Sequence, residues 1–126
     1  MINTVTIAGN LTRDPELRSM SSGLDVLEFS VAVNDRKKKG EEWVDDPSYF
    51  DCVLYGRKAQ SLNDHLSKGR KVTVSGKLKQ DRWQDSQGQN RSKVRIVASE
   101  VEYMDSGKVR ENVQSDDDLA DEDIPF

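Results

Sequence analysis

In three segments with alternating apolar residues, aromatic and positively charged side chains lie on or next to the face opposite the apolar ones. Tyr49 and Tyr55 alternate with the apolar residues of one segment, and Trp83 follows another that is rich in lysine. A ring outside the core offers a flat face to an unpaired base, and neighbouring cations meet the phosphates. The candidate nucleic-acid contacts from this pattern are Tyr49, Tyr55, Trp83, Lys71, Lys77, Lys79, Arg82, Lys93 and Arg95. The alternative is that these cations only solvate the outside of the domain and that the tyrosines are rim residues.

A polar stretch at residues 34–48 adds further candidates. Lys37 and Lys38 lie in its lysine run, and Trp43 follows them. We expect this stretch to be a long, mobile loop between two strands, because no apolar alternation runs through it. Trp43 either pins the loop to the folded domain or reaches a base, and the sequence leaves both interpretations open.

Residue types typical of enzyme chemistry are scarce. His65 is the one histidine and lies in an expected helix, and Cys52 is the one cysteine and shares its side of a strand with apolar residues. A partly exposed helix histidine and a buried structural thiol are the ordinary interpretations. No phosphate-binding loop, zinc-protease motif or nucleophile elbow is present. We therefore expect no catalytic residue, no cofactor and no metal ion; a nuclease whose acidic cluster binds a metal is the open alternative.

The end of the chain combines negative charge with an apolar tip. Residues 115–126 hold six acidic and no basic side chains, so we expect a disordered tail rather than a packed segment. A terminal aromatic ring beside a free carboxylate fits a pocket with a basic rim on another protein. The candidate partner-binding tip comprises Asp121, Glu122, Asp123, Ile124, Pro125 and Phe126. A tail that only aids solubility is the alternative.

The formal net charge of −4 hides an uneven distribution of charge along the 126 residues. Residues 1–114 carry 19 basic and 17 acidic side chains, and residues 67–95 alone carry nine basic and two acidic ones. Exposed charges interact over only about 8 Å at physiological salt, so a local basic excess outweighs the net charge. A basic body with an acidic end is therefore compatible with nucleic acid as a partner.

The order of periodic segments indicates an all-β domain. Alternating apolar residues predict strands at residues 3–11, 27–33, 49–55, 71–79 and 91–101. Ala59, Leu62 and Leu66 follow a helical spacing that predicts a helix over residues 57–68. Gly69 is placed to end this helix in a left-handed conformation. Five strands with one helix between strands 3 and 4 is the order of an OB-fold barrel, which closes the sheet and removes its edges.

The expected organisation is an OB-fold domain at residues 1–105, a short linker at 106–114 and the acidic tail at 115–126. No apolar run approaches the roughly 20 residues of a membrane-spanning helix, and the first residues do not resemble a secretory signal. A single cysteine excludes a disulfide framework within the chain. These features favour a cytoplasmic protein.

Several collinear motifs resemble the bacterial and phage-type single-stranded DNA-binding proteins. The matching segments are residues 5–20 (VTIAGNLTRDPELRSM), 49–66 (YFDCVLYGRKAQSLNDHL), 68–78 (KGRKVTVSGKL), the pair Arg82 and Trp83, and the final DIPF. The resemblance implies an OB-fold that assembles as a homotetramer and wraps single-stranded DNA without marked sequence preference. It further implies association with the nucleoid and with replication forks.

The resemblance also implies roles for individual residues. Base-stacking and phosphate-contacting positions of the family match or adjoin Tyr49, Tyr55, Trp83, Arg57, Lys68, Lys79 and Arg82. The acidic tip resembles the peptide by which the family recruits replication, recombination and repair proteins. Two features depart from the family. A further stacking tryptophan is unmatched near Lys37, where Trp43 can substitute, and only residues 105–114 separate the barrel from the acidic end.

The function expected from these patterns is sequence-independent binding and protection of single-stranded DNA. An accessory barrel of the primosome type, which acts mainly through protein contacts, is the alternative. Such an adaptor would bind DNA only weakly and a protein partner strongly.

Overall fold

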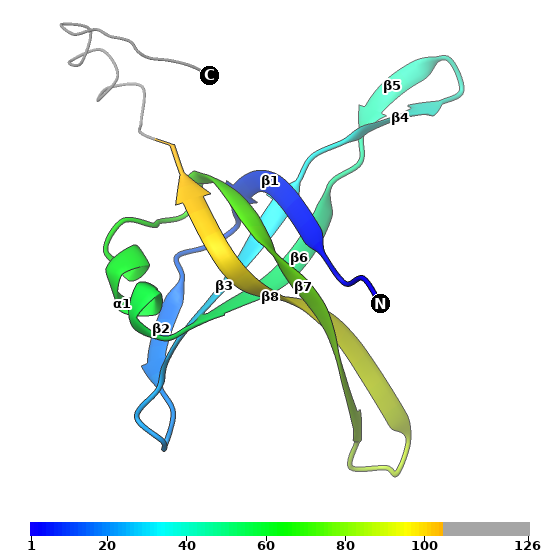
Figure 1. Cartoon of the computed structure of the whole chain (residues 1–126). Coiled ribbons are helices and arrows are strands. Elements are labelled where there is room, and N and C mark those ends of the chain that lie inside the picture. The colour runs from blue at the N-terminus through cyan, green and yellow to red at the C-terminus, as the bar shows by residue number, and fades with distance from the viewer. Residues whose placement is uncertain (105–126) are drawn as a thin grey trace, which may run out of the picture.

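Five segments with alternating apolar residues form strands that close into a ring, as the sequence predicts (Figure 1). The strands of the ring are β1 (Val5–Leu11), β3 (Asp25–Val33), β6 (Ser48–Tyr55), β7 (Lys71–Gln84) and β8 (Asn90–Tyr103). They follow the order β1, β7, β8, β6, β3, and β3 pairs again with β1. All these pairings are antiparallel except the parallel pairing of β6 with β8. The computed structural model describes residues 1–104, so the expected linker and acidic tail lie outside the described residues.

Each strand of the ring supplies one row of side chains to a single core. The least exposed large side chains are Phe29, Leu27, Ile96, Val31, Val72, Val74 and Cys52. Two glycines allow the strands to close around this core. A Cβ atom on Gly9 would collide with the carbonyl oxygen of Ala32, and one on Gly76 would collide with that of Val97. Glycine is therefore required at both positions, because no side chain fits between the strands there.

Strand β6 departs from the predicted alternation at two positions. Cys52 and Leu54 face the core as expected, but Phe50 is 37% exposed, and Val53 on the opposite face is buried. The described pairing of β6 with β8 begins at Cys52, so Phe50 lies before the first pair, where the core ends. Phe50 therefore shares the side of β6 that faces the core but lies beyond the core itself.

Two segments outside the five predicted strands form short strands of their own. β2 (Glu16–Ser19) follows Pro15 and pairs with β3. The prediction of a loop at residues 34–48 is wrong, because β4 (Arg36–Lys39) and β5 (Glu42–Asp45) form a hairpin there. The hairpin projects from the barrel (Figure 1). It has cross-strand pairs rather than an apolar row facing the core, and apolar alternation could not reveal it.

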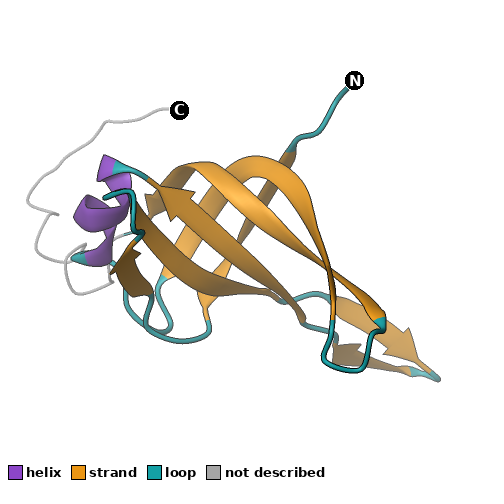
Figure 2. Ribbon diagram, turned by 90° about the horizontal axis from the view of Figure 1, so that it is seen from below, coloured by secondary structure: helices purple, strands orange, loops and turns teal. Residues whose placement is uncertain are grey.

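The helix α1 (Arg57–Asn63) is shorter than the predicted helix over residues 57–68. Past its end, the backbone N–H of Leu66 still donates to the carbonyl oxygen of Leu62 at 3.1 Å, and Leu66 is buried. Gly69 has a left-handed φ of 88° but closes a separate turn after the helix. Figure 2 shows the helix and the β4–β5 hairpin at opposite ends of the barrel. Among the described residues, no helix is long and apolar enough to cross a membrane.

Candidate nucleic-acid interface

Cross-strand register places most of the candidate side chains on one outer face of the barrel. Directly opposite residues of neighbouring strands point to the same face of a sheet. Lys79 pairs with Arg95 and Asp81 pairs with Lys93 between β7 and β8, and Val53 of β6 pairs with β8. The face shared by the three strands, called the outer face below, carries Tyr49, Asp51, Val53, Tyr55, Lys77, Lys79, Asp81, Trp83, Lys93 and Arg95.

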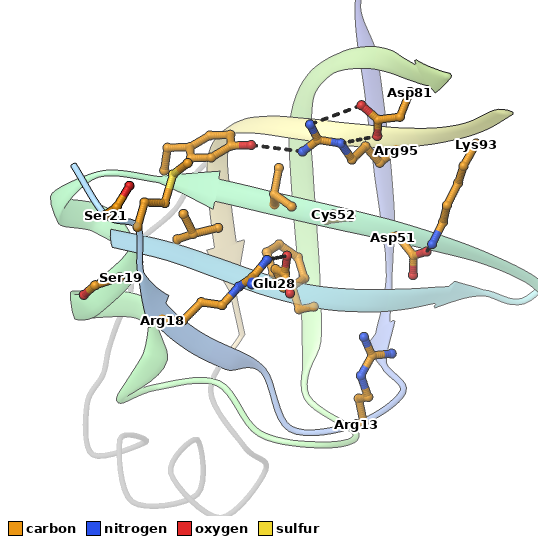
Figure 3. A pocket seen from close by; sticks show the side chains of 15 residues that line it. Arg13, Arg18, Ser19, Ser21, Glu28, Asp51, Cys52, Asp81, Lys93 and Arg95 are labelled. Carbon is orange, nitrogen blue, oxygen red and sulfur yellow. Dashed lines mark hydrogen bonds and ion pairs between the residues drawn. The ribbon is translucent and has the colours of Figure 1, made fainter. Parts of the chain in front are cut away.

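The outer face is hollowed into an open groove of about 670 Å³ (Figure 3). Val26 and Val53 line the groove and are themselves buried. Figure 3 shows Arg95 on one side of the groove and Arg18 on the other, and Arg13 also lines it. Sequence reasoning missed Arg13 and Arg18, because their short segment has no strong strand pattern. The signal that could have found them is the basic residue on each side of the Asp-Pro-Glu turn.

The Arg95 guanidinium links two other groups of the outer face. Its Nε donates to Asp81 Oδ2 at 2.7 Å, and a terminal nitrogen donates to the Tyr55 hydroxyl at 3.0 Å. The hydrogen bond from Arg95 holds the pKa of the Asp81 carboxyl below its ordinary value. The same bond, together with that to Tyr55, raises the pKa of Arg95. Asp81 and Arg95 therefore both stay charged at neutral pH.

Carboxylates also neutralise other cations of the groove. Asp51 Oδ2 lies 2.6 Å from Lys93 Nζ, and Glu28 Oε2 lies 2.6 Å from a terminal nitrogen of Arg18. The acidic partner of Lys93 comes from β6, which lies far from β8 in the sequence. Counting basic residues within residues 67–95 therefore overstated the positive charge of this surface.

Cations farther along β7 are less constrained. Lys77 and Lys79 form no hydrogen bond or ion pair with any residue in the described part of the chain. Arg82 lies on the opposite face of β7 from Lys79, because successive side chains alternate, and it donates to Gln80 Oε1 at 2.9 Å. The structure thus brings Lys77 and Lys79 to the outer face but not Arg82.

Trp83 lies near the tip of the β7–β8 hairpin and is 48% exposed. It pairs across the hairpin with Arg91. Asp85 organises the turn by accepting hydrogen bonds from the backbone N–H groups of Gln87 and Gln89, both at 2.9 Å, and from Arg91 Nε at 3.0 Å. The bonds from Gln89 and then Arg91 hold the pKa of the Asp85 carboxyl below its ordinary value. This tip presents an exposed ring beside a cation.

Trp43 occupies a similar position on the β4–β5 hairpin. It is 59% exposed and pairs with Lys38. Its carbonyl oxygen accepts a hydrogen bond from Arg36 at 3.3 Å, and Lys37 lies 3.8 Å from Asp46. The exposure of Trp43 on a projecting hairpin favours the interpretation that it reaches a base over the interpretation that it pins the segment to the barrel.

Three candidate cations lie toward the helix end of the barrel. Lys71 begins β7 eight residues before Lys79, which corresponds to about 26 Å along a strand that rises about 3.3 Å per residue. Arg57 begins α1 and lines a separate shallow hollow beside the helix. Lys68 lies in the connection from the helix to β7, and its backbone N–H donates to Asp14 Oδ1 at 2.8 Å. The structure does not gather these three with the groove.

The side chains considered for metal binding and nucleophilic chemistry have other surroundings. Within residues 1–104, no group of three or more His, Cys, Asp or Glu side chains is arranged to hold a metal ion. Burial, and secondly the charge of Asp51, raises the pKa of the Cys52 thiol to about 12. The His65 ring stacks on Tyr103 with 5.4 Å between ring centroids.

Known proteins resemble this chain in sequence and in fold. The model of the single-strand binding protein family matches residues 2–104. The chain is 44% identical to a single-stranded DNA-binding protein of Borreliella burgdorferi over 146 residues, covering 99% of this chain and 98% of that protein. It is 45% identical to one of Treponema pallidum over 105 residues, covering 83% of this chain and 59% of that protein.

A solved structure supports the assignment of the fold. The structure titled Plasmodium falciparum SSB complex with ssDNA matches with a TM-score of 0.74 at 24% identity, over 83% of this chain and 96% of that chain. The likeness confirms the expected OB-fold barrel.

Proposed function

Because the chain belongs to the single-strand binding protein family, we propose that it binds single-stranded DNA by stacking bases on exposed rings beside cations. The observation that carries this proposal is the exposure of Tyr49, Trp43 and Trp83, at 66%, 59% and 48%. A base covers such a ring whatever its identity, which makes the binding tolerant of sequence. The family consists of binding proteins, so the expectation that the chain is not an enzyme is confirmed.

The proposed contacts divide into stacking and electrostatic groups. Each stacked base contributes roughly 1–3 kcal/mol, and each neutralised phosphate releases counterions and makes the affinity depend on salt. The proposed stacking residues are Tyr49, Tyr55, Trp83 and Trp43. The cations proposed to lie along or near the path of the strand are Lys37, Lys38, Arg57, Lys68, Lys71, Lys77, Lys79, Arg82, Lys93 and Arg95.

The wider roles rest on the same family membership. We propose that the chain protects single strands during replication, recombination and repair in the cytoplasm, as a homotetramer of barrels. The division into barrel, linker (106–114) and tail (115–126) belongs to this proposal, as does recruitment of partner proteins by the tip at residues 121–126. The linker and the tip lie outside the described residues.

Anisotropy titrations with a labelled oligo-dT and a matched duplex test the proposal. We expect the single strand to bind far more tightly, and the logarithm of the association constant to fall with the logarithm of salt by about 0.7 per phosphate contact. Trp83→Ala should weaken binding roughly 5- to 140-fold, which corresponds to 1–3 kcal/mol for one stacked base.

Two lysine variants distinguish the loss of a phosphate contact from the loss of a positive charge elsewhere on the protein. Lys79→Ala should make the salt slope shallower, because Lys79 is on the outer face without an ion pair in residues 1–104. Lys58→Ala is the matched control, because the Lys58 side chain is 58% exposed but pairs with Glu100 at 3.5 Å. Equal affinity for duplex and single strand would reject the proposal.

A further inference from the structure

Arg95 is satisfied within the protein more completely than the other cations of the groove. Its Nε and one terminal nitrogen bond to Asp81 at 2.7 and 3.5 Å, and the other terminal nitrogen donates to the Tyr55 hydroxyl at 3.0 Å. Figure 3 shows the bonds between Arg95 and Asp81 as dashed lines. The Arg95 side chain is 24% exposed, whereas that of Lys93 in the neighbouring ion pair is 57% exposed. Three of the five N–H donors of the guanidinium are thus engaged within the protein, and a phosphate bound to Nε and a terminal nitrogen together would have to displace Asp81.

Tyr55 lies where the sheet gives its ring little support. It is the last residue of β6 and precedes Gly56, whose φ of 98° turns the chain toward α1. Its partner on β3 is Val26, a small side chain in the wall of the groove. Tyr55 is 36% exposed, and within residues 1–104 its hydroxyl has one hydrogen-bond partner, which is Arg95.

We propose that Asp81 and Arg95 are positioning residues for base stacking on Tyr55. Asp81 orients the guanidinium, the guanidinium orients the hydroxyl, and the ring is held against the groove before DNA arrives. Arg95 then contributes to affinity through Tyr55 and not as a phosphate ligand. A ring held in its binding orientation loses less conformational entropy when a base stacks on it. This inference rests on the proposed binding of single-stranded DNA.

A double-mutant cycle on Tyr55 and Arg95 tests the proposal. Tyr55→Phe keeps the ring and removes the hydroxyl, and Arg95→Lys keeps the charge and removes the planar fork that bonds two acceptors at once. Each variant should weaken binding of oligo-dT by about three- to tenfold, part of the roughly 5- to 140-fold effect of losing a stacked base. The affinity of the double variant for oligo-dT should equal that of the single variant with the lower affinity, because both changes break the same chain of bonds.

The opposite results would overturn the proposal. A phosphate ligand at position 95 acts independently of the Tyr55 hydroxyl, so the two losses would multiply in the double variant. A Tyr55→Phe variant that binds as tightly as the wild type would also overturn it. Salt slopes give a second readout, because loss of ring position leaves the slope unchanged, whereas loss of a phosphate contact makes it shallower by about 0.7.

Two carboxylate variants provide a matched comparison on the same face. Asp81→Asn and Asp51→Asn each remove one negative charge, and each releases one cation, Arg95 or Lys93. Asp51→Asn should tighten binding, because it releases Lys93 and leaves the Tyr55 ring in place. Asp81→Asn should bind about threefold or more weakly than Asp51→Asn, part of the effect of one stacked base. Equal tightening in both variants, with a steeper salt slope, would show that released Arg95 binds phosphate and would overturn the proposal.

Controls separate this inference from the function on which it rests. If the wild-type chain fails to prefer oligo-dT over duplex, the proposed function fails, whatever the variants do. If the wild type binds as expected and the cycle is additive, only the positioning role fails. Thermal unfolding of each variant is compared with the wild type, and a cycle of Tyr55→Phe with Asp81→Asn replaces the first cycle should Arg95→Lys not fold.

Discussion

Single cations of the outer face differ in how readily they can meet a phosphate. Lys79 is unpaired among residues 1–104, whereas Lys93 lies 2.6 Å from Asp51 with both side chains substantially exposed. An exposed ion pair of this kind contributes only about 0–1 kcal/mol, so a phosphate can replace Asp51 at little cost. The sequence could not reveal this difference, because Asp51 and Lys93 meet only through the pairing of distant strands.

The Cys52 thiol makes folding sensitive to alkali. Its pKa is about 12 in the folded chain against an ordinary value of 9.0, so the folded state keeps the proton that the unfolded state loses. Stability is therefore complete below pH 9 and is lost as the pH rises from 9 toward 12. At pH 10 the free energy of unfolding should be lower by about 1.4 kcal/mol from this group alone. Urea unfolding at pH 7 and pH 10 measures the change.

Cys52→Ala is the control for the other groups that titrate in alkali. The variant lowers stability at both pH values through lost packing, but it should lose less than the wild type between pH 7 and pH 10. An equal loss in both proteins would contradict the assignment. The same burial predicts that a thiol reagent labels Cys52 only after unfolding.

Elements were predictable where a row of apolar residues faces the core. Alternation identified all five strands of the ring, and the outward direction of Tyr49 and Tyr55 followed from it. The β4–β5 hairpin was missed because its stability comes from neighbouring strands and a turn at Gly40, with a φ of 66°, and not from core packing. The helix end was misplaced because Leu66 reaches the core from a turn that lies beyond the helix.

The β4–β5 hairpin should be removable without loss of the barrel. The backbone N–H of Asp46 donates to the carbonyl oxygen of Asp35 at 2.8 Å, so the two ends of the hairpin already meet. Replacing residues 36–45 by an Asn-Gly turn should leave the unfolding temperature close to that of the wild type, because no fully buried residue lies there. Affinity for oligo-dT should fall, and the salt slope should become shallower by about 0.7 per lost phosphate contact.

Trp43→Ala separates the ring from the cations of this hairpin. It should weaken binding without changing the salt slope, because the lysines stay in place. If the variant without the hairpin binds oligo-dT as tightly as the wild type, the hairpin takes no part in the interface.

At the scale of the whole molecule, one exposed apolar cluster continues the core-facing rows of β6, β7 and β8 beyond the end of the core. Phe50, Leu78 and Val94 are 37%, 44% and 53% exposed. Leu78 pairs with Ile96, and Ile96 pairs with Cys52. Phe50 and Val94 each precede one of these paired residues by two positions on parallel strands, so the three exposed side chains lie together. Exposed clusters of this kind mark protein interfaces, and a second copy of the chain is the partner implied by the proposed homotetramer.

Phe50→Glu should therefore disrupt assembly, because it places a charge in the centre of the buried contact. Sedimentation velocity should show the wild type as an assembly and the variant as a smaller species. Leu24→Glu is the matched control, because Leu24 is 41% exposed but lies in the β2–β3 turn, away from the cluster. A wild type that sediments as a monomer would contradict the proposed assembly, whereas an unchanged Phe50→Glu assembly would place the interface on another face.

Because DNA is proposed to pass over several barrels, the smaller species should also bind long oligo-dT more weakly than the control does. It should retain its affinity for a short oligo-dT.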